Sequence, residues 1–306
     1  MQAFLAPLGE LADYQEMLKN RRKGEGIIQV AGCVSSQKTH LMYALGDGCE
    51  YRVIAFSSEE KAKKAYDEYR LLTDSVYMYP ARDLLFYHAD IKGKLLTDRR
   101  MEVLRALLEK AQGAEITVIT TMDAFLDGLP YPEEVRRQRI RITGGDTIDF
   151  TDFQSRLAEL GYEREGQIEG PGQFAVRGGI LDVFPLTEEL PVRIELWGDE
   201  IDSIRSFDVE SQRSVENLEE VTIYPASENW EEGLGNVSFL DYFPKEKTLL
   251  LLDEPLRLQE EGEAVEEEYF HSRQSRLEAG MEEEEDGLTV FEVKAVIEKM
   301  NRYCGF

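Results

Sequence analysis

Cysteine, histidine and tryptophan are scarce in this chain of 306 residues, which contains three, three and two of them. The cysteines, Cys33, Cys49 and Cys304, are widely separated and do not follow the spacings of a metal site. We therefore expect plain thiols in a reducing cytoplasm, and no bound metal. The histidines are also scattered, and each is expected to be structural or solvated: His40, His88 and His271.

Long apolar runs and basic residues are scarce as well. No stretch is long and apolar enough to span a membrane, and the first residues lack the apolar core of a signal peptide. Aspartate and glutamate total 61 against 35 lysines and arginines, which gives a formal net charge of -26. A field of that sign repels phosphate backbones, so sequence-independent DNA binding is disfavoured unless a local basic cleft overrides it. An acidic surface suits solubility and basic protein partners.

In the first part of the chain, segments with the apolar pattern of a strand alternate with segments that have the pattern of a helix. Its length allows two or three domains, and 42% hydrophobic residues predict a globular protein. An amphipathic helix is predicted over roughly the first 20 residues. Strands are then predicted at 26–31, 51–56, 75–79 and 116–120, and helices at 58–72 and 97–112. This alternation is typical of a parallel sheet covered by helices on both faces. The aromatic segment 84–88 could stack on DNA, but its acidic surroundings favour a packed loop.

A phosphate-binding loop is suggested where a predicted strand runs through Gly32 into a helix. Lys38 and Thr39 are placed to meet a phosphate and magnesium, but Gln37 stands where the pattern requires glycine. The backbone at that position approaches the phosphates closely, in a conformation that glycine adopts readily. The loop is therefore either a degenerate nucleotide site or a relic whose lysine makes a surface contact.

A second feature of nucleotide sites follows the apolar run 249–252, which ends in Asp253 and Glu254. In a Walker B strand such carboxylates meet magnesium and the attacking water. Many buried strands end in an acid, so the pattern carries weight only beside the loop at Lys38. It indicates that residues after 226 complete the sheet. The other elements predicted there are helices at 260–268 and 294–301 and a strand at 288–293, with a solvated charge run at 282–286.

Between residues 139 and 226 strands dominate, with one helix at about 152–160. No lysine occurs between Lys110 and Lys245, so every basic side chain in this region is an arginine, which binds carboxylates in a planar bidentate geometry. We therefore predict an α/β fold, a RecA/helicase-like parallel sheet with helices on both faces. It is formed by residues 1–138 and 227–306 and interrupted by an inserted mainly β (α+β) domain at 139–226.

Two strands of the insert place particular side chains away from the apolar face. Alternation puts Arg177 on the face opposite Phe174 in one strand, and Arg193 and Trp197 on the face opposite Ile194 in another. An exposed tryptophan beside arginine has the composition of a protein-binding hot spot. The alternative is a tryptophan at the rim of the core and an arginine that is simply solvated.

The runs QFAVRGGILDVFP and VRIELWGDEIDSIRSFD, with the order of the flanking elements, resemble the homology module shared by the excision-repair subunit UvrB and the transcription-repair coupling factors (Mfd). The resemblance covers nearly the whole chain, and it is most specific in the insert. Gln37, and a segment 84–88 too short to be a DNA-clamping hairpin, match the N-terminal module of the coupling factors, which does not hydrolyse ATP, rather than UvrB.

This resemblance implies a non-catalytic segment that recruits UvrA, the damage-recognition subunit of nucleotide excision repair, through Arg177, Arg193 and Trp197. The chain stops at Phe306 without a stop motif, so we expect a longer protein whose later domains bind RNA polymerase and double-stranded DNA. ATP and magnesium would serve a motor in those domains, and this segment would need no cofactor. In the family, a later domain is thought to mask the insert until stalled RNA polymerase is engaged.

Two alternatives remain from the sequence. The first is a nucleotide-binding helicase half of a UvrB-like subunit acting on damaged DNA, with Lys38, Thr39, Asp253 and Glu254 as its active groups. The second is a DNA-binding module, which the net charge disfavours.

Overall fold

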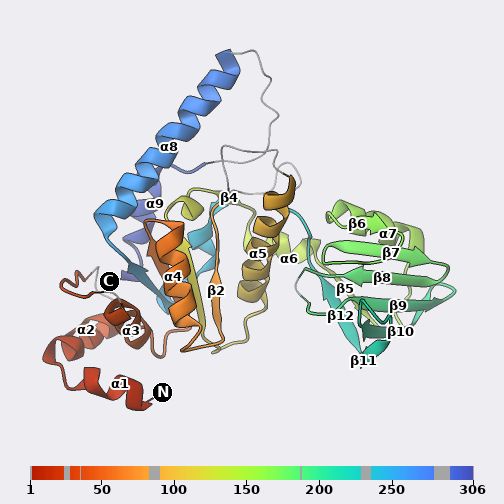
Figure 1. The fold of residues 1–306 in the computed structure, drawn as a ribbon, viewed down its shortest axis with the longest axis horizontal. Coiled ribbons are helices and arrows are strands. Elements are labelled where there is room, and N and C mark those ends of the chain that lie inside the picture. The colour runs from red at the N-terminus through yellow and green to blue at the C-terminus, as the bar shows by residue number, and fades with distance from the viewer. Residues whose placement is uncertain are drawn as a thin grey trace. The chain divides into compact units, whose positions relative to one another are not determined.

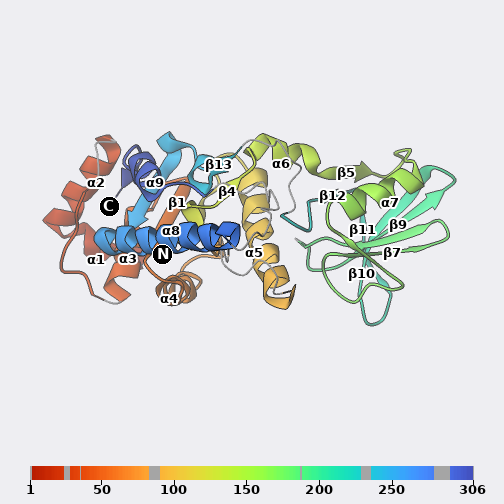
Figure 2. The same cartoon turned by 90° about the horizontal axis from the view of Figure 1, so that it is seen from above.

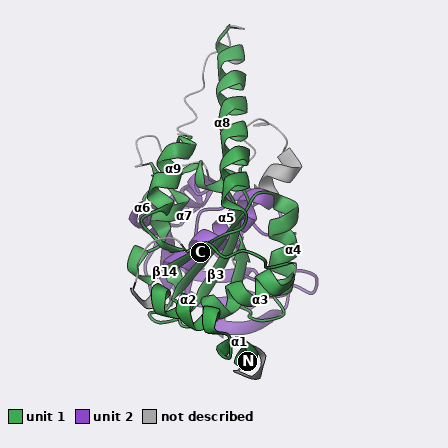
Figure 3. Ribbon diagram, turned by 90° about the vertical axis from the view of Figure 1, so that its left-hand side faces the viewer, with its two compact units in different colours: residues 1–89, 109–131, 235–306 green, residues 90–108, 132–234 purple. Residues whose placement is uncertain are grey.

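The computed structural model describes residues 2–23, 28–34, 36–82, 90–186, 188–228, 236–278 and 290–305. The chain divides into two compact units, coloured separately in Figure 3. Unit 1 comprises Met1–Ala89, Glu109–Tyr131 and Gly235–Phe306, and unit 2 comprises Asp90–Leu108 and Pro132–Leu234. The predicted segment 84–88 and the charge run 282–286 lie outside the described residues.

Unit 1 is built on a five-stranded parallel sheet. Its strand order is β15-β14-β1-β3-β2, and every neighbouring pair is parallel. The strands are β1 (Tyr51–Phe56), β2 (Val76–Met78), β3 (Ile116–Thr121), β14 (Thr248–Leu252) and β15 (Cys304–Gly305). Because β14 lies beside β1, residues that follow the insert complete the sheet, and the predicted α/β fold with an inserted β region is confirmed.

Helices surround this sheet within unit 1 (Figure 1). They are α1 (Gln2–Gly9), α2 (Ala12–Lys23), α3 (Ser36–Leu45), α4 (Glu59–Tyr69), α8 (Pro255–Glu278) and α9 (Val293–Met300). Helix α4 shows why such a segment folds: Ser58 caps it by accepting a hydrogen bond from the Lys61 amide, and Glu59 and Glu60 favour its N-terminal dipole. The distal part of α8 projects from the sheet (Figures 1 and 2), and none of the described residues forms a helix long and apolar enough to cross a membrane.

Short elements complete unit 1. A two-stranded antiparallel ladder joins β4 (Gly128–Leu129) to β13 (Val237–Ser238). Among the described residues, 3-10 helices occupy Asp123–Phe125, Phe239–Tyr242 and Lys245–Lys247. The ring of Phe239 stacks on the ring of Tyr79 at a centroid distance of 3.7 Å. This contact packs the 3-10 helix Phe239–Tyr242 against the residue that follows strand β2.

Three sequence predictions in unit 1 are wrong in detail. The single N-terminal helix is two helices, because the chain breaks between Gly9 and Ala12. Residues 28–31 form no strand, although the Ile28 amide donates to the Gly305 carbonyl at 3.0 Å. Residues 290–293 are not a strand either, since Val290 makes an isolated bridge and α9 begins at Val293.

Unit 2 contains a six-stranded sheet of order β11-β10-β9-β8-β7-β6, antiparallel except for the parallel pair β6 and β7. The strands are β6 (Glu163–Glu165), β7 (Gln173–Arg177), β8 (Ile180–Phe184), β9 (Val192–Trp197), β10 (Glu200–Phe207) and β11 (Ser214–Leu218). A separate antiparallel pair joins β5 (Ile140–Thr143) to β12 (Glu220–Ile223). The helices are α5 (Asp90–Glu109), α6 (Pro132–Gln138) and α7 (Phe150–Glu159).

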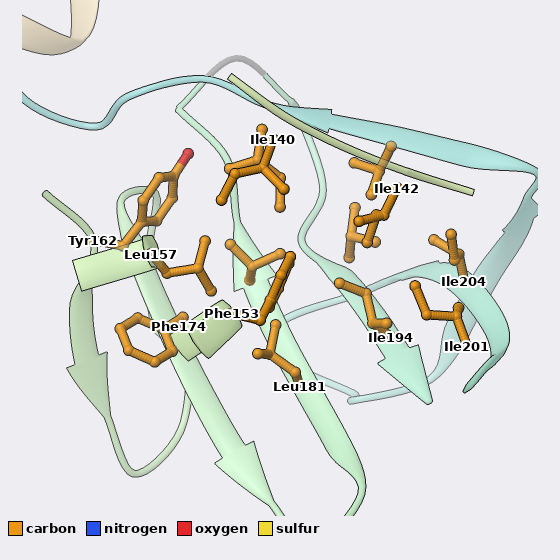
Figure 4. Close-up of a cluster of buried hydrophobic side chains, with 14 residues drawn as sticks. Ile140, Ile142, Phe153, Leu157, Tyr162, Phe174, Leu181, Ile194, Ile201 and Ile204 are labelled. Atoms are coloured by element: carbon orange, nitrogen blue, oxygen red, sulfur yellow. The ribbon is translucent and has the colours of Figure 1, made fainter. Parts of the chain in front are cut away.

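The core of unit 2 lies between one face of the six-stranded sheet and the elements α7, β5 and β12 (Figure 4). Asp149 starts α7 by accepting hydrogen bonds from the amides of Thr151 and Asp152. Phe153 and Leu157, one turn apart, then point toward the sheet and are buried. Burial of each such side chain stabilises the unit by roughly 1.5–3 kcal/mol. The sheet face toward this core is therefore unavailable to a partner.

Helix α5 also belongs to unit 2, although the predicted insert began only at residue 139. Two ion pairs join α5 to other parts of unit 2. Arg100, which is fully buried, binds Glu228 at 2.6 Å, and Arg105 binds Glu188 at 2.8 Å. Such pairs link α5 to segments more than 80 residues away in sequence (83 and 128), which no local pattern reveals.

Candidate functional site

The three residues predicted to bind a partner lie on one face of the six-stranded sheet. Register pairs Asp182 with both Ala175 and Arg193, and Ile180 with both Arg177 and Glu195. Directly opposed residues share a face, so Arg177, Arg193 and Trp197 lie on the same side of strands β7 and β9, opposite the core. We call this side the open face. Part of this face is buried by a small apolar cluster made of Ile168, Ala175, Phe184 and Phe207.

Trp197 is a strongly exposed part of the open face. It is the last residue of β9, immediately before Gly198, whose positive φ of 66° makes the tight turn into β10. With 84% of its surface exposed, the indole does not cover the core. The alternative of a rim tryptophan that shields apolar residues is therefore excluded, and a large apolar side chain stands in water without a packing role.

Arg193 differs from its prediction, which placed its side chain in water. Its guanidinium donates to both carboxylate oxygens of Asp182, at 2.7 and 2.9 Å, and to the side-chain carbonyl of Gln212 at 3.1 Å. It also lies 4.4 Å from the ring centroid of Phe207, a cation–π arrangement. Only 17% of the side chain is exposed, and the hydrogen bonds to Asp182 raise the pKa of the guanidinium. The alternation of side chains along β9 predicted the correct face for Arg193, but it did not predict that the side chain is mostly buried.

Arg177 remains accessible. Its side chain is 49% exposed, and its guanidinium lies 3.9 Å from a carboxylate oxygen of Asp182, beyond a strong hydrogen bond. The turn that follows, Gly178–Gly179, connects β7 to β8, with Gly178 at a φ of 61°. Arg177 and Trp197 thus supply a cation and an aromatic ring on one open face, although each ends a different strand.

Sequence reasoning missed the residues that organise this face. Asp182 is an acid in the middle of an apolar strand, and its side chain is 3% exposed. A lone acid in such a run is the one signal that would have identified it, because a buried carboxylate requires a partner. Arg205 and Ser203 of β10 similarly hold Glu195, through an ion pair and a hydrogen bond of 3.0 Å. Gln212 and Phe207 carry no signal of their own in the sequence.

The loop of unit 1 predicted to bind phosphate brings its candidate residues together. Gly32 adopts a φ of 86°, and α3 starts shortly after it and carries an exposed Gln37. The Lys38 ammonium lies 2.6 Å from Asp253 and 3.9 Å from Glu254, so the fold does bring these three residues together. The hydrogen bond to Asp253 raises the pKa of Lys38.

The remaining groups of this loop are also satisfied within the protein. The Thr39 hydroxyl donates to Glu68. Glu254 has an unusual positive φ of 55° and binds Lys61 at 2.7 Å, which lowers the pKa of the Glu254 carboxyl. A magnesium nucleotide needs the lysine, the hydroxyl and the acid for phosphate and metal. Here those groups are bound to one another or to neighbouring side chains.

A cavity of about 730 Å³ opens beside the loop. Its lining is mostly apolar and includes Val30, Leu41, Met42 and Leu251, with Lys38 and Asp253 at one side. Its size would accept a small molecule. Its cations, however, are already neutralised: Arg257 lies 3.3 Å from Glu254, in addition to the pair at Lys38.

Comparison with known proteins gives matches to one family and to several curated relatives. Residues 140–229 match the family described as the UvrB interaction domain. The transcription-repair-coupling factor of Bacillus subtilis (strain 168) is 32% identical over 222 residues, which are 72% of this chain and 19% of that protein. The protein of the same name from Staphylococcus aureus (strain bovine RF122 / ET3-1) is 39% identical over 155 residues, 51% of this chain and 13% of the relative.

A third relative, from Staphylococcus haemolyticus (strain JCSC1435), is 39% identical over 153 residues, 50% of this chain and 13% of that protein. The chain thus spans at most about a fifth of the length of these curated relatives, 19% in the first case. The resemblance inferred from the two strand runs is confirmed: residues 140–229 match the UvrB interaction domain, and the chain is similar to one part of the transcription-repair-coupling factors.

Proposed function

We propose that this chain is a non-catalytic interaction module that recruits UvrA through the open face of its six-stranded sheet. The observation that carries the proposal is the exposure of Trp197 at 84% and of the Arg177 side chain at 49%, both on the face of the sheet opposite the main core of unit 2. Tryptophan and arginine are the residues that most often dominate binding energy at protein interfaces. The similarity of residues 140–229 to the UvrB interaction domain supports a partner from excision repair.

The larger role follows from the relatives rather than from this chain. Within a full-length coupling factor, the module would bring UvrA to RNA polymerase stalled at a DNA lesion. RNA polymerase, double-stranded DNA, ATP and magnesium would then be bound by other parts of that protein. The net charge of -26 agrees with this division, because it disfavours DNA binding by this segment.

Calorimetric titration of purified UvrA into this chain tests the proposal. We expect saturable binding that the charge reversal Arg177→Glu weakens by at least 10-fold, while the thermal unfolding temperature stays unchanged. The matched control is Arg164→Glu, an exposed arginine on the edge strand β6 of the same sheet. Absence of binding by the unmodified chain, or equal losses for the two reversals, would reject the proposed surface.

A nucleotide-binding function is the second candidate, because Lys38 and Asp253 meet beside a cavity of about 730 Å³. Titration of ATP with magnesium separates the two functions. We expect no binding up to millimolar nucleotide, since Lys38, Thr39 and Glu254 are already engaged. Binding that Lys38→Ala abolishes would instead favour the nucleotide-dependent helicase half.

A further inference from the structure

On the open face, Asp182 lies between Arg177 and Arg193 and is shared unequally by them. Its carboxylate accepts two hydrogen bonds from Arg193, at 2.7 and 2.9 Å, and has Arg177 at 3.9 Å. The carboxylate is almost fully buried, with 3% of the side chain exposed. A buried charge needs a partner, and losing that partner strongly favours any rearrangement that supplies another. Arg177 is the cation already within reach.

Arg193 is held on three sides. Asp182 binds its guanidinium from one side, Gln212 accepts from another, and the ring of Phe207 lies beneath it. Gln212 is itself fixed, with a positive φ of 57° and a side-chain amide that donates to the Val209 carbonyl at 2.8 Å. A guanidinium so fixed and 17% exposed has little freedom to turn toward a second protein. Arg177, at 49% exposed and loosely paired, has that freedom.

We propose that Arg193 is a positioning residue: it neutralises Asp182 and so leaves Arg177 free to bind an acidic side chain of the partner. Without Arg193, Asp182 captures Arg177 and draws it off the surface. The capture requires a movement of only about 1 Å, from 3.9 Å to the roughly 2.8–2.9 Å of a charge-assisted hydrogen bond. The inference rests on the proposed function, in that it assigns separate roles to residues of one UvrA-binding surface.

A rescue experiment distinguishes positioning from direct contact. Arg193→Met retains much of the side-chain volume over Phe207 and removes the charge, and we expect it to weaken UvrA binding at least 10-fold, as Arg177→Ala does. Adding Asp182→Asn to Arg193→Met removes the charge that captures Arg177, so binding returns to within about threefold of the unmodified chain. If Arg193 touched UvrA itself, the double variant would bind as weakly as Arg193→Met, and the proposal would fail.

A crystal structure of the Arg193→Met chain gives a readout that needs no UvrA. We expect Arg177 and Asp182 within about 3 Å of each other, and an unchanged 3.9 Å separation would overturn the inference. This measurement also separates two kinds of failure. If the unmodified chain does not bind UvrA, the proposed function is wrong, yet the crystal structure still decides whether Arg193 restrains Arg177.

Discussion

Replacing Trp197 with alanine removes the largest exposed apolar group of the open face. An aromatic side chain of this kind buries about 150–250 Å² when a partner covers it. Because 84% of Trp197 is exposed in the free chain, nearly all of that burial would occur on binding. At about 25 cal/mol per Å², burying the exposed 84% contributes at most roughly 3–5 kcal/mol. Measured hot spots are typically about 2–4 kcal/mol, which raises the Kd by roughly 30- to 1000-fold.

The same exposure predicts almost no effect on folding. An exposed side chain without packing partners changes the free energy of unfolding by less than about 0.5 kcal/mol when it is truncated. Calorimetric titration with UvrA measures the first effect, and urea unfolding measures the second. Leu71→Ala is the matched control, because Leu71 is 85% exposed on α4's C-terminal side in unit 1 and should alter neither quantity. A folded Trp197→Ala chain that binds UvrA within threefold of the original would refute the reasoning.

Three further predictions concern stability. Lys38→Ala leaves the nearly buried Asp253 carboxylate unpaired and should lower the free energy of unfolding by about 1–3 kcal/mol in urea titrations, with part of the loss recovered when Asp253 is also replaced by alanine. Hydrogen bonds from two lysines lower the pKa of Glu50 from 4.5 to about 2, so its stabilising effect is present above pH 4.5 and is lost as the pH falls toward 2. Glu50→Gln should therefore flatten the dependence of the unfolding temperature on pH in that window, and an unchanged slope would contradict the assignment. Gly161→Ala should destabilise unit 2 by about 1–3 kcal/mol more than Gly145→Ala in thermal unfolding, because both have a φ of 87° but only at Gly161 would the new Cβ meet a side chain, at 2.3 Å.

The strongly periodic elements of the fold could be predicted from the sequence, and the short ones could not. Strands β1, β3 and β14 are rich in buried apolar and β-branched residues, a pattern that can be recognised locally. Strand β15 has two residues, Cys304 and Gly305, and is a strand only because they pair with Leu249 and Leu250. The break between α1 and α2 was hidden because the leucine spacing continues through it.

The candidate site divides in the same way. Side-chain alternation along β7 and β9 gave the correct face for Arg177 and Trp197, since parity is a local property. The burial of Arg193 depends on Asp182 across the sheet and on Gln212 in a later loop, and such long-range pairing leaves no periodic trace. The same holds in unit 1, where Thr39 turns to Glu68 rather than toward the acids at the end of β14.

Hydrogen exchange of the whole chain, measured with and without saturating UvrA, tests the central claim most directly. The account predicts slowed exchange in the hairpin of β9 and β10 (residues 192–207) and at the turn between β7 and β8, and unchanged exchange in the parallel sheet of unit 1. Slowed exchange confined to the parallel sheet or to the loop at Lys38, with the hairpin unaffected, would contradict it.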